Sequence, residues 1–152
     1  MGAQSFGGLD FRKDGYVLQG SGSLAMLPDT GSSATVTVGT AMTATISSLI
    51  TDGASSYRLV KDGLGTLNLM AANSFDGGVD LTAGTLGVGN NAALGTGTLT
   101  MTGGTTLRAM ADTLTLGNGV TLGGTGTVDT QAYTMTLTGT VSGAGGKLVK
   151  TG

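Results

Sequence analysis

Apolar side chains alternate with small polar ones through residues 57–90, and short glycine turns interrupt the alternation every few residues. The segment reads YRLVKDGLGTLNLMAANSFDGGVDLTAGTLGVGN. Alternation with a period of two places successive side chains on opposite faces, which is typical of β-strands. A helical chain is not expected, because glycine costs about 1 kcal/mol at each interior helical position. The pattern therefore predicts an all-β chain.

The same alternation predicts short strands on both sides of this segment. Residues 1–15, which contain Phe6 and Phe11, are expected to form an N-terminal lead and a partial cap. Residues 16–152 are expected to form the repeating part of the chain. Strands are predicted at 16–20, 23–27, 34–38, 44–51, 58–61, 66–70, 79–82, 85–88, 98–102, 105–109, 113–116, 120–122, 127–130, 134–138, 140–142 and 147–150.

One phrase of the sequence occurs twice. LVKDG at 59–63 returns as LVKTG at 148–152, so that Lys150 corresponds to Lys61 and a further repeat is predicted to begin at 147. A chain that repeats its own motif is expected to stack similar units along one axis. Aromatic residues make up only 4% of the chain, which suits the narrow interior of a parallel β-helix better than the core of a β-sandwich. We therefore predict a parallel β-helix, with an antiparallel β-sandwich adhesin as the alternative.

Composition narrows the range of functions. Charged residues make up 11% of the chain, the net charge is −2, and no basic cluster is present, so nucleic-acid binding is not expected. All nine acidic residues are aspartate, which favours turns. Because cysteine and histidine are both absent, disulfides and metal sites built from these residues are excluded.

Targeting signals are not evident in the sequence. No stretch of about 18 apolar residues is present, so no transmembrane helix is predicted. The N-terminus, MGAQSFGGLD, has neither the basic nor the apolar region of a signal peptide. Since the chain also stops inside the returning phrase, we expect it to be an internal fragment of a longer protein. The lack of cysteine is compatible with export.

Candidate chemistry is weak throughout the chain. Residues 123–131 resemble a calcium-binding nonapeptide, but Asp129 stands one place too late and the unit is not repeated. Asp76 and Asp80, with Asp62 near them, could form a carboxylate pair for glycan hydrolysis, although turn formation is the favoured role. No catalytic residue, metal site or cofactor is predicted. Stacked amide ladders or turn positions are expected for Asn68, Asn73, Asn90, Asn91 and Asn118.

Residues 57–95 resemble the autotransporter-associated β-strand repeat, also called the passenger-associated transport repeat, of Gram-negative type V secreted proteins. The match to the family pattern is looser over residues 96–152. Residues 1–56 share only the general style of the sequence and do not match the motif. VDLTAG at 79–84 departs from the Thr-rich segment that the family more often has. The family motif places structural repeat residues at Leu59, Lys61, Gly63, Gly65, Thr66, Leu67, Gly77, Gly78, Gly84, Thr85, Leu86 and Gly89.

The resemblance implies a right-handed parallel β-helix in the passenger domain of an autotransporter. It implies a non-enzymatic role in secretion and surface display, with adhesion as a role of the whole protein. The implied partners are the protein's own C-terminal β-barrel translocator and host or bacterial surface receptors, with no small-molecule substrate. The implied location is the surface of a Gram-negative bacterium, reached through the periplasm and outer membrane. A β-helical domain that binds or cleaves glycans is the alternative function.

Overall fold

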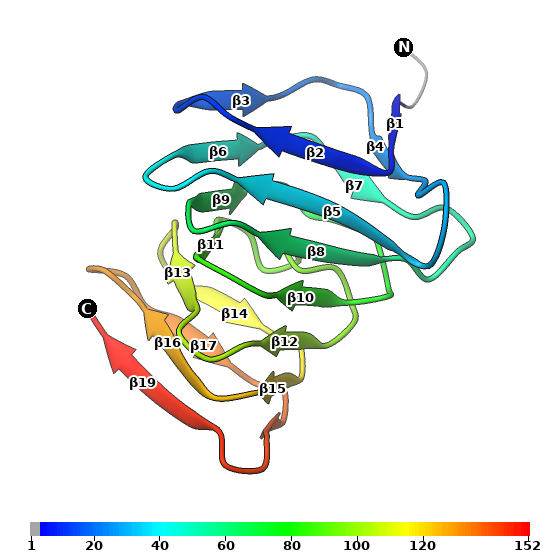
Figure 1. The fold of residues 1–152 in the computed structure, drawn as a ribbon. Helices are drawn as coiled ribbons and strands as arrows, with labels where there is room; N and C mark the ends of the chain where they lie inside the picture. The colour runs from blue at the N-terminus through cyan, green and yellow to red at the C-terminus, as the bar shows by residue number, and fades with distance from the viewer. Residues whose placement is uncertain (1–3) are drawn as a thin grey trace.

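The computed structural model describes residues 4–152, and the stacked strands run down a single column from the N-terminus to the C-terminus (Figure 1). Every strand pairing in this part of the chain is parallel, and no helix occurs in it. Parallel pairing between strands of successive turns defines a β-helix of about seven coils. The predicted parallel β-helix is therefore confirmed, and the antiparallel sandwich is excluded.

The first side of the column is a seven-stranded sheet, which we call sheet B. Its strands follow one another along the axis with one strand from each coil. In order they are β2 (Gly8–Phe11), β5 (Ser33–Val38), β8 (Arg58–Asp62), β10 (Val79–Leu81), β12 (Leu99–Met101), β15 (Val120–Leu122) and β18 (Val141–Ser142).

The second side is also a seven-stranded sheet, sheet C, and it begins after the short turn that follows each strand of sheet B. In order its strands are β3 (Tyr16–Leu18), β6 (Thr43–Ile46), β9 (Thr66–Leu69), β11 (Thr85–Val88), β13 (Thr106–Ala109), β16 (Thr125–Asp129) and β19 (Lys147–Thr151).

The third side is less regular. At the N-terminal end it contains β1 (Gln4–Phe6), β4 (Leu24–Met26) and β7 (Ile50–Thr51), and near the C-terminal end β14 (Leu114–Leu116) and β17 (Met135–Leu137). Between these two short sheets the backbone still bonds from coil to coil: the N–H of Ser74 donates to the carbonyl of Ile50, and that of Thr96 to Phe75.

We number the coils by their strands. Coil 1 contains β1–β3, coil 2 contains β4–β6, coil 3 contains β7–β9, coil 4 contains β10 and β11, coil 5 contains β12 and β13, coil 6 contains β14–β16, and coil 7 contains β17–β19. Leu59, Val79 and Leu99 occupy one register position in coils 3, 4 and 5. The coils in the middle of the column are thus 20 residues long on this side.

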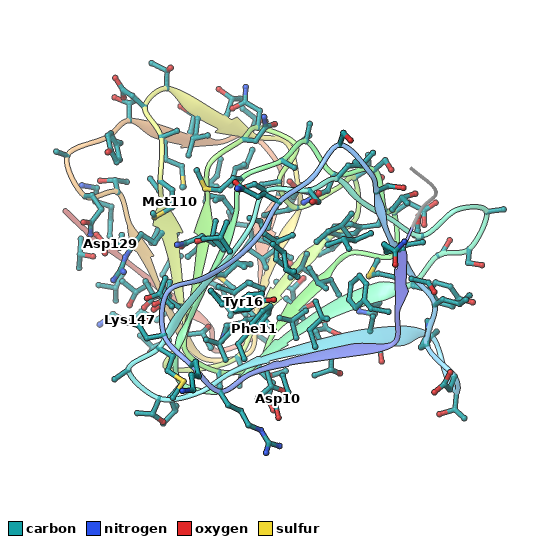
Figure 2. The ribbon with its side chains drawn as sticks, turned by 90° about the horizontal axis from the view of Figure 1, so that it is seen from above. Asp10, Phe11, Tyr16, Met110, Asp129 and Lys147 are labelled. Carbon is teal, nitrogen blue, oxygen red and sulfur yellow. The ribbon has the colours of Figure 1, made fainter. Side chains whose placement is uncertain are left out.

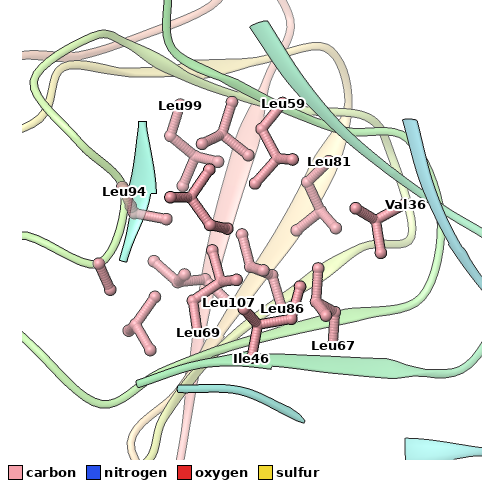
Figure 3. Close-up of a cluster of buried hydrophobic side chains, with 14 of the residues drawn as sticks. Val36, Ile46, Leu59, Leu67, Leu69, Leu81, Leu86, Leu94, Leu99 and Leu107 are labelled. Carbon is pink, nitrogen blue, oxygen red and sulfur yellow. The ribbon is translucent and has the colours of Figure 1, made fainter. Parts of the chain in front are cut away.

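The core is a column of aliphatic side chains inside the coils (Figure 3). Leu67, Leu86 and Leu107 lie in register in successive strands of sheet C and are fully buried. On the outside of the same strands, Thr66, Thr85 and Thr106 are stacked and half-buried. The alternation in the sequence therefore separates an apolar interior from a hydroxyl-bearing exterior, since β-branched polar residues suit a half-exposed sheet.

One predicted strand is wrong in extent. The sequence predicts a single strand over 44–51, whereas the chain turns a corner at Ser47, Ser48 and Leu49, so that β6 ends at Ile46 and β7 begins at Ile50. The corner contains no glycine or proline, so no turn residue marks it in the sequence. Ser48 is buried at this bend.

Within the predicted N-terminal lead, β1 and β2 pair in register with β4 and β5 and bury Phe6 and Phe11. The part of residues 1–15 that the structure describes thus forms coil 1 together with β3. Viewed along the axis, Phe11 and Tyr16 lie over the inside of the coil, whereas Asp10 lies at the periphery (Figure 2). The ring centroids of Phe11 and Tyr16 are 5.6 Å apart. A capping role for this coil stays a prediction.

The returning phrase lies on a different side from its first occurrence. Lys61 is in β8 of sheet B, whereas Lys150 is in β19 of sheet C, opposite Val128. The start of a further repeat at residue 147 stays a prediction. Residues 4–152 contain no helix long and apolar enough to cross a membrane.

Candidate functional site

The predicted motif residues lie where one coil contacts the next. Gly63 and Gly84 occupy the turns between sheets B and C with positive φ angles of 77° and 70°. An added Cβ on Gly63 would lie 2.2 Å from the carbonyl oxygen of Val38, and one on Gly84 would lie 2.5 Å from that of Gly65. Neighbouring turns therefore stack with their backbones in direct contact. Only glycine, which has no Cβ, allows the backbones to come this close.

The other motif glycines also lie in close contacts. At each of three glycines, an added Cβ would lie within 2.5 Å of a backbone carbonyl oxygen of a neighbouring coil. The carbonyl belongs to Gly39 for Gly65, to Tyr57 for Gly77 and to Thr98 for Gly78. Gly89 instead lies beneath the side chain of Met70, whose Cε would be 2.5 Å from the added atom. The twelve motif residues thus divide into glycines at inter-coil contacts, aliphatic core residues, stacked threonines and one lysine.

Lys61 is the single charged side chain among the fully buried residues of the described chain. Its Nζ donates hydrogen bonds to the backbone carbonyls of Asp62 (2.9 Å) and Gly63 (2.7 Å) in its own turn. A third, of 3.1 Å, goes to Ala83 in coil 4. Burial away from water lowers the pKa of Lys61 to about 8, partly offset by the nearby Asp62 carboxylate. The ammonium thus forms hydrogen bonds to the turns of two successive coils, coil 3 and coil 4.

Asparagine side chains link coils on the third side. The Oδ1 of Asn73 accepts from the N–H of Ile50 in coil 3 at 2.8 Å, and its Nδ2 donates to the carbonyl of Ala93 in coil 5 at 2.6 Å. The Nδ2 of Asn118 donates to the carbonyls of Gly95 (3.1 Å) and Gly97 (2.7 Å). These amides satisfy backbone groups where the side has no regular strand.

The remaining asparagines bond locally or to the adjacent coil. Asn90 accepts from the N–H of Ala92, and Asn91 from that of Thr115. Asn68 donates weakly to Thr45 at 3.4 Å, while its Oδ1 is buried without a partner and faces Gly87. None of the five forms an amide–amide contact in the described chain, so the ladder interpretation is wrong for them. Asn73, Asn90, Asn91 and Asn118 lie in turns or loops, as predicted, whereas Asn68 lies within β9.

Aspartate side chains are committed to structural contacts. Asp80 accepts from both Nε and Nη2 of Arg58, and this hydrogen bonding lowers the pKa of Asp80 and raises the pKa of Arg58. Asp62 accepts from the hydroxyl of Thr82 at 3.1 Å. An ionised carboxylate held by an arginine is a poor general acid, so Asp80 is unsuited to the general-acid role in the candidate pair for glycan hydrolysis.

Three further aspartates link coils. The buried carboxylate of Asp52 accepts from the N–H groups of Tyr57 and, in coil 4, Asp76. Asp112 accepts from the N–H of Thr134, which lowers the pKa of Asp112. Asp129, the calcium candidate, pairs with Arg108 at 3.0 Å and lies at the periphery in Figure 2. Residues 4–152 contain no group of three acidic side chains able to hold a metal ion.

Comparison with known proteins assigns part of the chain directly. Residues 59–88 match the family model described as Passenger-associated-transport-repeat. The chain carries a passenger-associated-transport-repeat. The repeat comprises β8 to β11, that is, the sheet B and sheet C strands of coils 3 and 4. It contains Lys61, Asn73, the Arg58-bound Asp80 and the stacked turns at Gly63 and Gly84.

The chain as a whole is similar to an adhesin. It is 38% identical over 155 residues to the Adhesin BmaC autotransporter of Brucella suis biovar 1 (strain 1330). The alignment covers 99% of this chain and 4% of that protein, so the chain corresponds to a small part of its relative's length. No solved structure matches the chain. Both comparisons thus relate this β-helical segment to passenger repeats of autotransporters.

Several contacts between coils 3 and 4 were not predicted from the sequence. Asp52 looks like an ordinary loop residue before Gly53, and Arg58 and Asp80 stand 22 positions apart. Once the coil length near 20 residues is known, polar residues separated by one coil length become candidates for such pairs. That length is the signal that could have found them.

Proposed function

We propose that this chain is a structural and secretion-assisting segment of an autotransporter passenger, displayed on the surface of a Gram-negative bacterium. The observation that supports it most is the set of side chains that join coil 3 to coil 4, in and next to the repeat. Lys61, Asn73 and Asp52 each bind a backbone group of the adjacent coil. A coil that has folded thus presents fixed hydrogen-bonding groups to the coil that folds next.

This arrangement suits passage through the outer membrane. A coil that folds outside the cell and bonds to its neighbour resists sliding back through the pore. The absence of cysteine and the low charge of the chain favour threading in the unfolded state. The expected partner is the C-terminal β-barrel translocator of the same protein. The expected location is the cell surface, with no enzymatic activity in this segment.

Adhesion is proposed for the whole protein, because the relative is an adhesin. Surface receptors on host or bacterial cells would be its partners. Within this segment the exposed residues Thr82 and Thr98, which flank strands of sheet B, contribute to a polar surface without a charged cluster. A glycan-binding or glycan-cleaving domain remains the alternative, but no contact among the described aspartates favours it.

The test uses the full-length parent protein in its native host. Gly63→Val and Gly84→Val together should prevent the turns of coils 3 and 4 from stacking, while Gly15→Val and Gly145→Val lie in open turns and serve as the matched control. We expect the first pair to reduce the amount of passenger accessible to external protease by several-fold at equal synthesis. Equal display of both variants would contradict assistance in secretion. Adhesion is measured separately, with a variant lacking residues 57–95.

A further inference from the structure

Lys61 occupies a place that aliphatic residues occupy in other coils. Its register partners along the interior of sheet B are Val36 in coil 2 and Leu81 in coil 4, followed by Met101 and Leu122. All four are buried apolar residues. A charged group in such a column carries a cost of desolvation, so its presence requires an advantage that leucine or methionine lacks.

We infer that Lys61 fixes the register in which coil 4 stacks on coil 3. Its Nζ reaches across the interface to the carbonyl of Ala83 while it also holds the carbonyls of Asp62 and Gly63. The contact thereby joins two successive turns at one defined pair of positions. The inference concerns the folded chain and does not depend on export.

The aliphatic core alone discriminates poorly between registers. A slip of one residue would turn every buried side chain outward and is strongly disfavoured. A slip of two residues keeps each face in place, because Leu59, Val79, Leu81 and Leu99 are similar in size and character. Such a slip would displace coil 4 by about 6.6 Å along the strands. The Ala83 carbonyl would then lie out of reach of the Lys61 ammonium, which would be left buried with one bond fewer.

Asn73 and Asp52 also cross this interface, on its third side. Two other contacts lie nearer the lysine and differ from it in an important respect. Arg58 and Asp80 also cross the interface, but their side chains are about one-third exposed, so solvent weakens their discrimination. Gly63 and Gly84 permit the close stacking of the native turns. They have no side chain, however, and so provide no polar or charged group that would favour the native register over a slipped one. Lys61 combines full burial with hydrogen bonds to both turns.

Disulfide trapping in the 152-residue chain tests the inference, since the chain has no cysteine of its own. Thr66→Cys with Thr85→Cys reports the native register, because these positions are opposite each other. Val60→Cys with Thr82→Cys reports a two-residue slip in one direction, and Asn68→Cys with Thr85→Cys reports the other. Stacked positions are about 4.8 Å apart, within disulfide range, whereas the slip pairs are about 8 Å apart in the native register.

Each cysteine pair is combined with Lys61→Met and, as the matched control, with Leu81→Ala. Methionine is already tolerated in this column at position 101. Leu81→Ala leaves a cavity in the same column without removing a donor to Ala83. We expect Lys61→Met to raise the ratio of slip to native disulfide by about 10-fold to 100-fold, the range for a lost hydrogen bond from a charged group. Leu81→Ala should leave the ratio unchanged.

An unchanged ratio in Lys61→Met, or an equal rise in Leu81→Ala, would overturn the inference. The first result would assign the register to the other contacts between coils 3 and 4, those of the glycine turns, Asn73 and Asp52, and the second to core packing. If Lys61→Met forms no native disulfide, Lys61→Gln is judged by the same criteria, because glutamine keeps an N–H donor without the charge and should give a smaller rise.

Discussion

The amide of Asn73 accepts a 2.8 Å hydrogen bond from the backbone N–H of Ile50, one coil earlier, while it donates to Ala93, one coil later. One buried side chain therefore connects three successive coils. It does so where the third side lacks a strand between β7 and β14.

Replacing this amide should be costly. Asn73→Ala leaves a buried N–H and a buried carbonyl without partners, and each is expected to cost about 1–3 kcal/mol of the free energy of unfolding. Urea unfolding followed by circular dichroism measures the loss. Asn91→Ala is the matched control, because Asn91 is exposed and makes one bond, to Thr115. Equal losses in the two variants would show that burial of the amide is unimportant.

The close contact between Gly63 and Val38 gives a second prediction. Gly63→Ala must adopt a positive φ angle and place its Cβ 2.2 Å from a carbonyl oxygen. Gly104→Ala adopts a similar angle, 84°, with no atom within 4 Å. The left-handed conformation costs a non-glycine residue about 1–2 kcal/mol in both variants. Thermal unfolding should therefore show a small loss for Gly104→Ala and a clearly larger one for Gly63→Ala, because only Gly63→Ala displaces the backbone of coil 2. Similar melting temperatures would contradict the stacked-turn interpretation.

Much of the fold could be predicted because its information is local. Alternation over a few residues placed Leu67 and Leu86 in the core and Thr66 and Thr85 outside, as the structure has them. A strand needs only its own residues to reveal which face is apolar. The corner at Ser48 was missed because it depends on the length of the side rather than on a turn residue.

The contacts between coils could not be predicted in the same way. A lysine between Val60 and Asp62 does not show from the sequence that its side chain points inward, since lysine is seldom buried. Its partner Ala83 is 22 residues away and contributes a backbone carbonyl, which every residue has. The family resemblance identified the position of Lys61 but not the reason for it. Only the stacked coils show that reason.

The ion pair between Arg58 and Asp80 predicts a dependence of stability on acid. Hydrogen bonding to Arg58 lowers the pKa of Asp80 in the folded chain. The pair therefore stabilises the fold above the unfolded pKa of aspartate, and this contribution is lost as the pH falls through the folded pKa. Because both side chains are about one-third exposed, the effect should be about 1 kcal/mol or less and weaker in high salt. Urea unfolding of the wild type and Arg58→Met from pH 6 to pH 3 should show the two stabilities converging. A constant difference would contradict it.

The buried ammonium of Lys61 predicts a second rise of stability with pH, this time at alkaline pH. Its pKa is lowered from 10.5 to about 8 by burial, so the folded chain releases this proton before the unfolded chain does. Between these two values the unfolded state binds more protons, and stability should therefore rise with pH. The rise amounts to about 2 kcal/mol between pH 8 and pH 9.5, at about 1.4 kcal/mol per pH unit. Lys61→Met, which shares every other titrating group, isolates it: the stability of the wild type relative to this variant should be constant below pH 7 and increase above pH 8. A relative stability that does not change up to pH 10 would mean that the three carbonyls compensate the ammonium fully for its loss of water.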